Sequence, residues 1–372
     1  MSNTQKKNVP ELRFPEFEGE WEEKQLGNII KVNSGKDYKH LDKGDIPVYG
    51  TGGYMTSVSE PLSEIDAVGI GRKGTINKPY LLEAPFWTVD TLFYCTPKKE
   101  TDILFILSLF RKINWKVYDE STGVPSLSKQ TINKINRFVP TNKEQQKIGK
   151  FFSKLDRQIE LEEQKLELLQ QQKKGYMQKI FSQELRFKDE NGNDYPDWTN
   201  ERLGEVTTVT MGQSPKSVNY TDNSNDTVLI QGNADIESGL INPRIYTREV
   251  TKLIQKDEII LTVRAPVGKL AMAQINACIG RGVCSIKGDK FLYYFLEWFA
   301  TQNKWIRFSQ GSTFESISGN DIRNIHIKIP VEDERTKIIK LLNSLDVLNS
   351  KTDLKIQNLK QRKQSLLQKI FV

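Results

Sequence analysis

Several signatures of catalysis are missing from this 372-residue sequence. It holds no GxxxxGK(S/T) loop, which excludes the usual phosphate-binding loop of nucleotide hydrolases. It also holds no GxSxG or HExxH motif, which excludes the common serine-hydrolase and zinc-peptidase signatures. We predict no glycine turn for a dinucleotide or a methyl donor. The chain is therefore expected to bind rather than to catalyse, and no catalytic residue is predicted.

Histidine and cysteine are scarce. The two histidines, His40 and His326, lie far apart in the sequence, and neither has a ligand partner nearby. Cys95, Cys278 and Cys284 form neither a CxxC pair nor a metal-ligand spacing. Buried free thiols in a reducing compartment are therefore expected. No metal site and no cofactor are predicted for this chain.

Long hydrophobic runs are also missing. No run approaches the roughly 18 apolar residues of a membrane-spanning helix, and the nearest candidate, residues 103–110, is too short. Residues 1–10 lack the apolar core of a signal peptide. These absences predict a cytoplasmic protein without a membrane partner.

The composition nevertheless suits globular domains. Hydrophobic residues make up 37% of the chain and six tryptophans are present, which is enough for ordinary cores. The length suits two domains with connecting elements. An excess of 54 Lys and Arg over 47 Asp and Glu gives a net charge of +7, which weakly favours a polyanionic partner.

The dominant feature is an internal repeat. Residues 140–181 align without a gap with residues 330–371, and both copies close on the motif Gln-Lys-Ile-Phe. The opening ELRF…W…LG of residues 11–27 returns at residues 184–204 with a short insertion. A repeat of this length predicts the order domain, helix, domain, helix.

Each copy of the long segment carries an apolar heptad, which is typical of a helix paired in a coiled coil. At about 1.5 Å per residue each helix would be roughly 60 Å long. The alternative is that the two helices dock separately on globular cores. Polar residues interrupt both heptads at matching positions, Glu162/Thr352 and Lys173/Lys363. The predicted seam residues are Ile148, Phe152, Leu155, Ile159, Leu166, Leu169, Ile338, Leu342, Leu345, Ile356, Leu359 and Leu366.

The interiors of the two halves differ in sequence but share a pattern. Residues 31–97 and 206–287 carry β-branched and aromatic runs punctuated by glycine, which predicts short strands and turns. Helices are expected at residues 103–115 and from residue 291 to about 306. A polar turn and a strand are expected to follow at residues 121–140 and 311–330.

The predicted fold class is α+β. Two mixed α/β domains are expected to be joined and separated by two long helices, which form an antiparallel coiled coil and give the chain a pseudo-twofold internal repeat. The expected bounds are 1–140 for the first domain, 141–181 for the first helix, 182–330 for the second domain and 331–372 for the second helix.

Glycine-rich turns in both predicted domains carry Lys, Arg, Tyr, Asn and Gln. Each turn alone is explained by turn chemistry with solvated side chains. Together they favour DNA, because Arg and Lys pair with guanine or phosphate, and Asn and Gln pair with adenine. The candidate DNA-binding residues are Lys36, Tyr38, Lys39, Tyr49, Thr51, Tyr54, Arg72, Lys73, Gln213, Ser214, Lys216, Tyr220, Gln231, Asn233, Arg264 and Arg281.

Over nearly its whole length the chain resembles the specificity subunits of type I restriction-modification systems, the HsdS family. Each motif alone is weak, and their order and duplication make the resemblance specific. It is carried by the LRFPEF…W…LG opening and its echo, the segments IPVYGTGGYM, GRKGTI, GQSP, IQGNADI and VRAPVGK, and both QKIF helix ends.

The resemblance implies two target-recognition domains. Each would read one half of a bipartite, asymmetric site in double-stranded DNA, and the two helices would set the spacer between the halves. The helices would also dock two methyltransferase subunits, and motor-nuclease subunits would join in the full complex. S-adenosylmethionine, ATP and Mg are then expected on those partners. The base-contacting residues do not transfer from the family, because the interiors vary.

Two other interpretations stay open. The chain could be the specificity module of a methylation-only system that lacks a nuclease partner. It could also be a coiled-coil scaffold protein without a DNA role. The basic turns and the divergent interiors argue against a scaffold, which needs neither.

Overall fold

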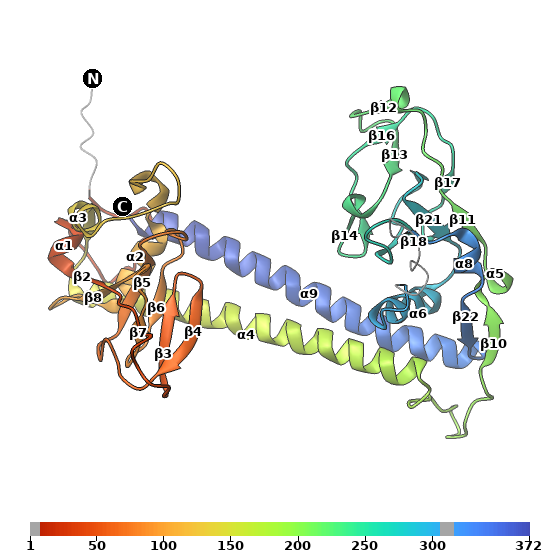
Figure 1. Ribbon diagram of the computed structural model, residues 1–372, viewed down its shortest axis with the longest axis horizontal. Helices are drawn as coiled ribbons and strands as arrows, with labels where there is room; N and C mark the ends of the chain where they lie inside the picture. The colour runs from red at the N-terminus through yellow and green to blue at the C-terminus, as the bar shows by residue number, and fades with distance from the viewer. Residues whose placement is uncertain (1–7, 306–315) are drawn as a thin grey trace. The chain divides into compact units, whose positions relative to one another are not determined.

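The computed structural model describes residues 8–305 and 316–372 (Figure 1). The chain divides into two compact units. Unit 1 combines Met1–Gln164 with Thr352–Val372, and unit 2 is Lys165–Lys351. The predicted helix end near residue 306 and the predicted start of the polar turn at residue 311 lie outside the described residues.

Unit 1 contains two small sheets. The four-stranded sheet has the order β2-β8-β5-β6 and is antiparallel throughout. The three-stranded sheet has the order β4-β3-β7, in which β3 runs parallel to β7. β1 and β9 form a separate antiparallel pair. The elements are β1 (Glu22–Gln25), α1 (Leu26–Ile29), β2 (Ile30–Ser34), β3 (Ile46–Gly50), β4 (Gly53–Val58), β5 (Ala67–Gly71), β6 (Tyr80–Leu82), β7 (Trp87–Thr88), β8 (Leu92–Pro97), α2 (Ile103–Lys112), η1 (Trp115–Tyr118), α3 (Lys129–Lys134) and β9 (Asn136–Val139).

Unit 2 is built in the same way. Its four-stranded antiparallel sheet has the order β11-β21-β18-β19, and its five-stranded sheet has the order β12-β16-β13-β20-β17. β10 pairs with β22, and β14 pairs with β15. The elements are β10 (Thr199–Arg202), α5 (Leu203–Val206), β11 (Val209–Met211), η2 (Ser217–Asn219), β12 (Tyr220–Thr221), β13 (Thr227–Ile230), η3 (Asn233–Asp235), β14 (Ile236–Glu237), β15 (Leu240–Ile241), β16 (Tyr246–Thr247), β17 (Leu253–Ile254), β18 (Ile259–Thr262), β19 (Leu270–Met272), β20 (Ala277–Ile279), β21 (Val283–Ile286), α6 (Lys290–Thr301), α8 (Gly319–Arg323) and β22 (His326–Ile329).

The two units share one skeleton beneath their unlike sequences. β13 runs parallel to β20 as β3 runs parallel to β7, with Ile230 opposite Ile279 as Tyr49 is opposite Thr88. The sheet order β11-β21-β18-β19 repeats the order β2-β8-β5-β6. The strand and turn pattern predicted for both interiors is therefore confirmed, and the mixed helix and strand class with it.

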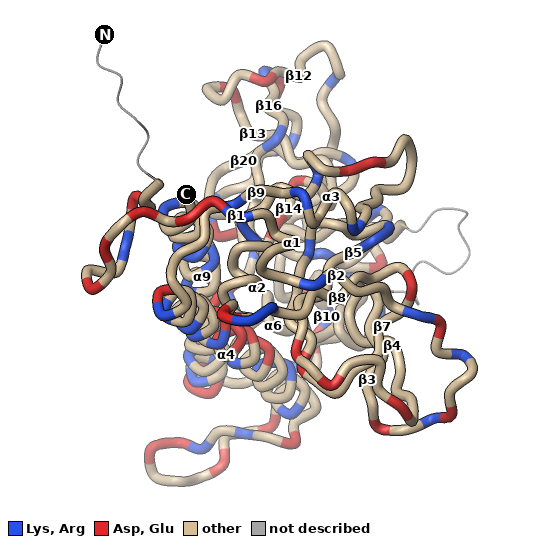
Figure 2. Tube along the Cα trace, turned by 90° about the vertical axis from the view of Figure 1, so that its left-hand side faces the viewer, with Lys and Arg blue, Asp and Glu red and all other residues tan. Residues whose placement is uncertain are grey.

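Two long helices complete the fold, α4 (Asn142–Phe181) and α9 (Glu332–Ile370). In unit 1 the first part of α4 lies against the last part of α9, and in unit 2 the last part of α4 lies against the first part of α9 (Figure 1). The pairing is therefore antiparallel, and the helices do not dock separately. Lys and Arg are interspersed with Asp and Glu along both helices (Figure 2).

The heptad positions are buried to different degrees. Ile148 and Phe152 belong to the core of unit 1, and Ile338, Leu342 and Leu345 belong to the core of unit 2. Leu366 packs against the core of unit 1, and the other seam residues lie beyond these cores. Ile159 and Ile356 are buried in unit 1, whereas Leu155, Leu359 and Leu366 in unit 1 and Leu166 and Leu169 in unit 2 are half-buried.

The repeated opening seats each long helix on its own domain. In unit 1 the Arg13 guanidinium donates to both carboxylate oxygens of Glu144 at 2.8 and 2.7 Å, and the Trp21 indole N–H donates to the same carboxylate at 3.3 Å. Glu144 lies in the first turn of α4 and is 1% exposed. This arginine fork, with two hydrogen bonds from one guanidinium, offsets the free-energy cost of burying the Glu144 carboxylate.

Unit 2 repeats the same contact at the start of α9. The Arg186 guanidinium donates to both oxygens of Glu334 at 2.8 Å, and Trp198 donates at 2.9 Å. Glu334 is fully buried. The hydrogen bonds to Glu334 raise the pKa of Arg186, which keeps the guanidinium charged. Trp21 and Trp198 are both buried, so each anchors its opening segment in its own unit.

The closing Gln-Lys-Ile-Phe motif anchors the other end of each helix. Ile370, the last residue of α9, and Phe371 after it enter the core of unit 1, where the Phe371 ring stacks on Phe152. Ile180 and Phe181 of α4 enter the core of unit 2. Each long helix thus begins in one unit and ends in the core of the other, which explains why both of its ends are repeated in the sequence.

The lysines at one matched polar position of the heptads have different surroundings. In unit 2 Lys173 lies between Glu297 of α6 and Asp346 of α9, at 2.7 Å from each. Burial would lower the pKa of Lys173, but the charges and hydrogen bonds of these carboxylates outweigh it and raise the pKa. In unit 1 Lys363 contacts Asp156, which also accepts from Arg111. Here burial lowers the pKa of Lys363.

We expect Arg186→Ala to cost about 3–5 kcal/mol of folding free energy, because it leaves the buried Glu334 carboxylate without its cation. Arg248→Ala is the matched control in the same unit. Arg248 is 69% exposed and lies 3.7 Å from Asp226, so its loss should stay below about 1 kcal/mol. Denaturant unfolding of both variants measures the difference. Equal losses would show that the fork does not stabilise unit 2.

We expect Lys173→Met to destabilise the protein by about 2 kcal/mol, because Glu297 and Asp346 then face each other without a cation. Lys363→Met should cost about 1 kcal/mol or less, because Asp156 keeps Arg111 as its partner. Calorimetric unfolding compares the two. Acidification should narrow the difference in stability between the two variants, because protonation of Glu297 or Asp346 removes the repulsion between these carboxylates. A larger loss for Lys363→Met than for Lys173→Met would contradict the stabilising role given to Lys173.

Candidate nucleic-acid interface

Three loops meet at one edge of the four-stranded sheet in unit 2. The Gly212 N–H donates to Val283 O at 3.0 Å, and the Gln213 N–H donates to Ile279 O at 2.9 Å. The Val263 N–H donates to Gly282 O at 2.9 Å. The loops that follow β11, β18 and β20 are therefore tied together by their own backbones.

This junction carries a cleft with two arginines. The cleft has a volume of about 640 Å³, and both Arg264 and Arg281 are exposed in it. Neither guanidinium forms an ion pair with any residue that the structure describes. Two uncompensated cations in a cleft suit an anionic or guanine-bearing ligand. The lining residues are Met211, Val263, Arg264, Ala265, Arg281, Ser316, Ile317 and Ser318.

Other predicted residues of unit 2 surround the same junction. Ser214 Oγ accepts from the Arg281 N–H at 3.0 Å, and the half-buried Gln231 follows β13. Asn233 begins the short η3 turn. Lys216 and Tyr220 lie apart from this group. Tyr220 sits on β12, the edge strand two positions from β13, and Lys216 precedes it.

The corresponding loops of unit 1 meet in the same way. The Gly35 N–H donates to Leu92 O at 3.1 Å, and the Lys36 N–H donates to Thr88 O at 2.8 Å. The Arg72 N–H donates to Thr91 O at 2.8 Å, and its guanidinium lies 5.8 Å from the Phe93 ring centre. Lys36, Arg72 and Lys73 are thereby brought together at the edge where unit 2 has Gln213 and Arg264.

The glycines of these turns serve the fold first. A Cβ on Gly35 would lie 1.9 Å from Val89 O, and a Cβ on Gly212 would lie 2.1 Å from Gly280 O. Glycine in a loop can also let the backbone approach a ligand closely. The structure shows that at these two positions the close neighbour is the chain's own backbone.

The remaining candidates of unit 1 lie in and around the three-stranded sheet. Tyr38 is half-buried and packs against the apolar cluster around Val48 and Trp87, whereas Lys39 is exposed. Tyr49 is half-buried near the end of β3, and Thr51 and Tyr54 lie at the β3–β4 turn. Tyr38 is therefore a core residue in part, which the sequence pattern could not distinguish from a surface tyrosine.

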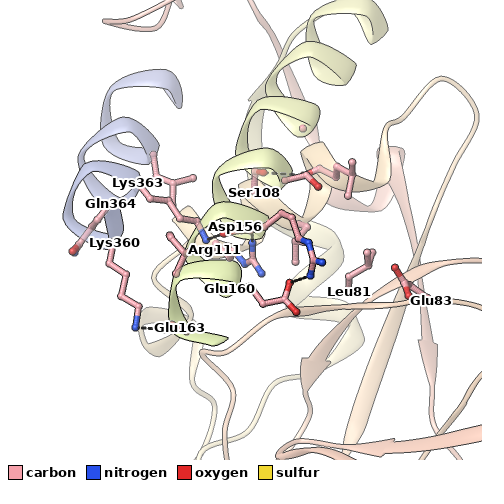
Figure 3. Close-up of a pocket in the computed structure, with 17 residues that line it drawn as sticks. Leu81, Glu83, Ser108, Arg111, Asp156, Glu160, Glu163, Lys360, Lys363 and Gln364 are labelled. Atoms are coloured by element: carbon pink, nitrogen blue, oxygen red, sulfur yellow. Dashed lines mark hydrogen bonds and ion pairs between the residues drawn. The ribbon is translucent and has the colours of Figure 1, made fainter. Parts of the chain in front are cut away.

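A cleft of unit 1 is lined by ion pairs rather than free cations. It has a volume of about 930 Å³ and lies where α4, α9 and α2 meet (Figure 3). Arg157 pairs with Glu160 at 2.8 Å and Lys360 pairs with Glu163 at 2.6 Å, while Lys363 and Arg111 share Asp156. Each of these cations already has a carboxylate, so this cleft is not a second anion site.

The glycine spacing GxGxxG does occur in unit 1, at Gly69, Gly71 and Gly74. Its presence does not overturn the prediction that the chain has no glycine turn for a dinucleotide or a methyl donor. β5 leads through residues 72–79 into β6 and not into a helix. Without a helix N-terminus to bind pyrophosphate, the spacing does not form a dinucleotide site.

The three cysteines are buried free thiols, as predicted. Burial raises the pKa of Cys95, and it raises the pKa of Cys284 to about 12. Among the described residues, no group of three His, Cys, Asp or Glu side chains is placed to hold a metal ion. Within the same part of the chain, no helix is both long and apolar enough to cross a membrane.

Sequence comparisons identify related proteins. The family described as type I restriction modification DNA specificity domain matches residues 18–171 and 195–361. The type I restriction enzyme MjaX specificity subunit of Methanocaldococcus jannaschii is 30% identical over 261 residues, which cover 66% of this chain and 61% of that protein. The MjaVIII specificity subunit of the same organism is 25% identical over 312 residues, 77% of this chain and 71% of that protein. The match thus spans less than two thirds of the MjaX subunit.

Two solved structures share the fold. The S subunit of a type I restriction-modification system from M. genitalium has a TM-score of 0.69 at 16% identity, and the match covers 98% of this chain and 99% of that one. A chain from a structure of a type I R-M system, solved to study complex assembly and conformational transition, has a TM-score of 0.59 at 19% identity and covers 94% and 97%. At these identities the likeness establishes the architecture.

The cleft of unit 2 makes Arg264 the sharpest single test. Arg264→Ala should weaken DNA binding by about 1–3 kcal/mol at one base position if the guanidinium reads guanine. If it contacts phosphate, the loss should be uniform across sequences and the salt dependence should fall by about one unit. Arg244→Ala is the control, because Arg244 is an exposed arginine outside the cleft lining. Equal effects of the two substitutions on binding would remove Arg264 from the interface.

Proposed function

The chain belongs to the family of type I restriction modification DNA specificity domains, and from this premise we propose that it is the DNA sequence-specificity subunit of a type I restriction-modification complex. In this proposal each target-recognition domain reads one half of a bipartite, asymmetric site in double-stranded DNA. The bounds proposed for these domains are residues 1–140 and 182–330.

One observation carries the proposal: the same loops of one skeleton bear different side chains in the two units. Lys36 and Lys73 of unit 1 stand where unit 2 has Gln213 and Arg264. A common frame would present both units to DNA in the same way, and unlike side chains would select unlike base pairs. A coiled-coil scaffold would need neither the frame nor the loops.

The long helices, proposed as residues 141–181 and 331–372, have two roles in this function. They set the spacer between the half-sites, and they dock two methyltransferase subunits. The continuity of α4 and α9 supports the spacer role, since each begins in one unit and ends in the core of the other. Motor-nuclease subunits join in the full complex.

The chain itself is proposed to be non-catalytic. S-adenosylmethionine, ATP and Mg would bind to the partner subunits, which carry out methylation, translocation and cleavage. This division of labour fits a sequence that lacks the P-loop and hydrolase signatures. A reducing, cytoplasmic setting also stays a prediction.

Exchange of one interior tests the two-reader proposal. Residues 206–287 are replaced by the matching segment of a family member with a different site, and the chain is co-expressed with its methyltransferase subunit. Methylation mapping should show adenine methylation at a split site with one changed half and one unchanged half. The reciprocal exchange of residues 31–97 should change the other half. A change in both halves from either exchange would contradict the proposal.

A further inference from the structure

The shared skeleton diverges most at one connection. In unit 1, β3 turns into β4 through residues 51–52. In unit 2 the equivalent strands, β13 and β16, are connected by residues 231–245, which contain η3 and the β14–β15 hairpin. This connection lies beside the cationic junction in both units, because the strand before it accepts a backbone hydrogen bond from the segment after β7 or β20, from Val89 N–H to Tyr49 O and from Gly280 N–H to Ile230 O. Variation placed at that point would alter what the junction recognises.

In unit 1 this connection makes β3 and β4 a tight hairpin, the β3–β4 ribbon, at the edge of the three-stranded sheet, with β7 on the other side of β3 (Figure 1). Gly53 has a φ of +106°, which permits the tight turn. Tyr54 and Met55 follow it on β4 and are 64% and 52% exposed. Large apolar side chains at adjacent exposed positions suit a partner surface better than water.

The ribbon is held by a ladder of tyrosines. The Tyr80 hydroxyl on β6 donates to Gly50 O at 2.5 Å, and the Tyr80 ring lies 6.2 Å from that of Tyr49. The Tyr49 ring in turn lies 6.4 Å from that of Tyr54. Burial raises the pKa of Tyr80 above its ordinary value, so its hydroxyl stays a donor into alkaline pH. The four-stranded sheet thereby fixes the position of the ribbon turn.

The ribbon is next to the cations but carries none itself. The Val89 N–H donates to Tyr49 O at 3.0 Å, and Lys36 is bonded to the neighbouring Thr88. Residues 46–58 contain no charged side chain. Lysine and arginine at the junction suit phosphates, whereas Thr51, Tyr54 and Met55 suit base edges and the thymine methyl group.

We infer that the β3–β4 ribbon enters the major groove and reads one half-site through apolar contact with thymine, and that Tyr80 is the positioning residue that holds it. The inference rests on the proposed function and adds which element contacts DNA, which groove it enters and which base it reads. A two-stranded ribbon fits the major groove, where each base pair is distinguishable. Cations beside it fix the register on the backbone.

The test uses the full chain with its methyltransferase subunit and starts from the methylation map of the wild type. Tyr54→Ala and Met55→Ala should relax the preference for one or two base pairs in one half-site, by about tenfold each, and leave the other half-site unchanged. Replacing thymine by deoxyuracil at those positions should weaken wild-type binding by about fourfold, the factor expected for one buried methyl group. The same replacement should not affect the Tyr54→Ala complex.

Tyr80→Phe separates positioning from folding, because it removes the hydroxyl and keeps the ring. It should relax the same half-site as Tyr54→Ala while the melting temperature stays close to that of the wild type. Tyr94→Phe is the control, since Tyr94 is a half-buried tyrosine of the same sheet that packs on Phe86. It should leave both half-sites intact.

Two outcomes would overturn the inference. One is an unchanged methylation map for Tyr54→Ala, Met55→Ala and Tyr80→Phe. The other is an equal loss at both half-sites, which would show a general effect on stability or docking. Failure of the proposed function is a different result, since the wild-type complex itself would then produce no site-dependent methylation.

Discussion

A buried glutamate at the start of each long helix organises the structure. Glu144 and Glu334 are almost wholly removed from water, and each is satisfied by an arginine fork and a tryptophan N–H from the segment that opens its unit. Burying a carboxylate is unfavourable unless it is paired and hydrogen-bonded. The opening segment is therefore bound to its helix, and the helix direction is set relative to the domain on which it begins.

Backbone contacts likewise explain how one skeleton can carry different loop side chains in the two units. Backbone hydrogen bonds tie the loops at the sheet edge together, and glycines without room for a Cβ make those ties possible. Such contacts are independent of the neighbouring side chains. Lys36 and Lys73 of unit 1 can therefore be replaced by Gln213 and Arg264 in unit 2 without a change of the backbone frame. The frame is therefore held by backbone atoms, whereas the side chains at the sheet edge vary, as the proposed reading of two different half-sites requires.

The sequence predicted the two periodic helices and missed the contacts between residues that lie far apart in the chain. The heptads of α4 and α9 were visible because a regular apolar spacing is a local property. The role of Arg13 was not visible in the sequence, because its partner Glu144 lies far along the chain and only the fold brings the two together. Sequence also could not separate the core-packed Tyr38 from the exposed Tyr54, because both precede or follow glycine turns. The GxGxxG spacing is the opposite case. It is visible in the sequence, but the strand that follows it, and not a helix, shows that it does not form a dinucleotide site.

The central claim is that two like-built readers share one antiparallel helix pair that fixes their spacing. The direct measurement is methylation mapping after a heptad is inserted in each helix, after Leu161 in α4 and after Gln357, the position that the pairs Asp156–Lys363 and Lys173–Asp346 place opposite it. A heptad preserves the paired face and adds about 10 Å, or about three base pairs. Both half-site sequences should be retained with a gap longer by that amount. An unchanged gap with both halves intact would contradict the claim.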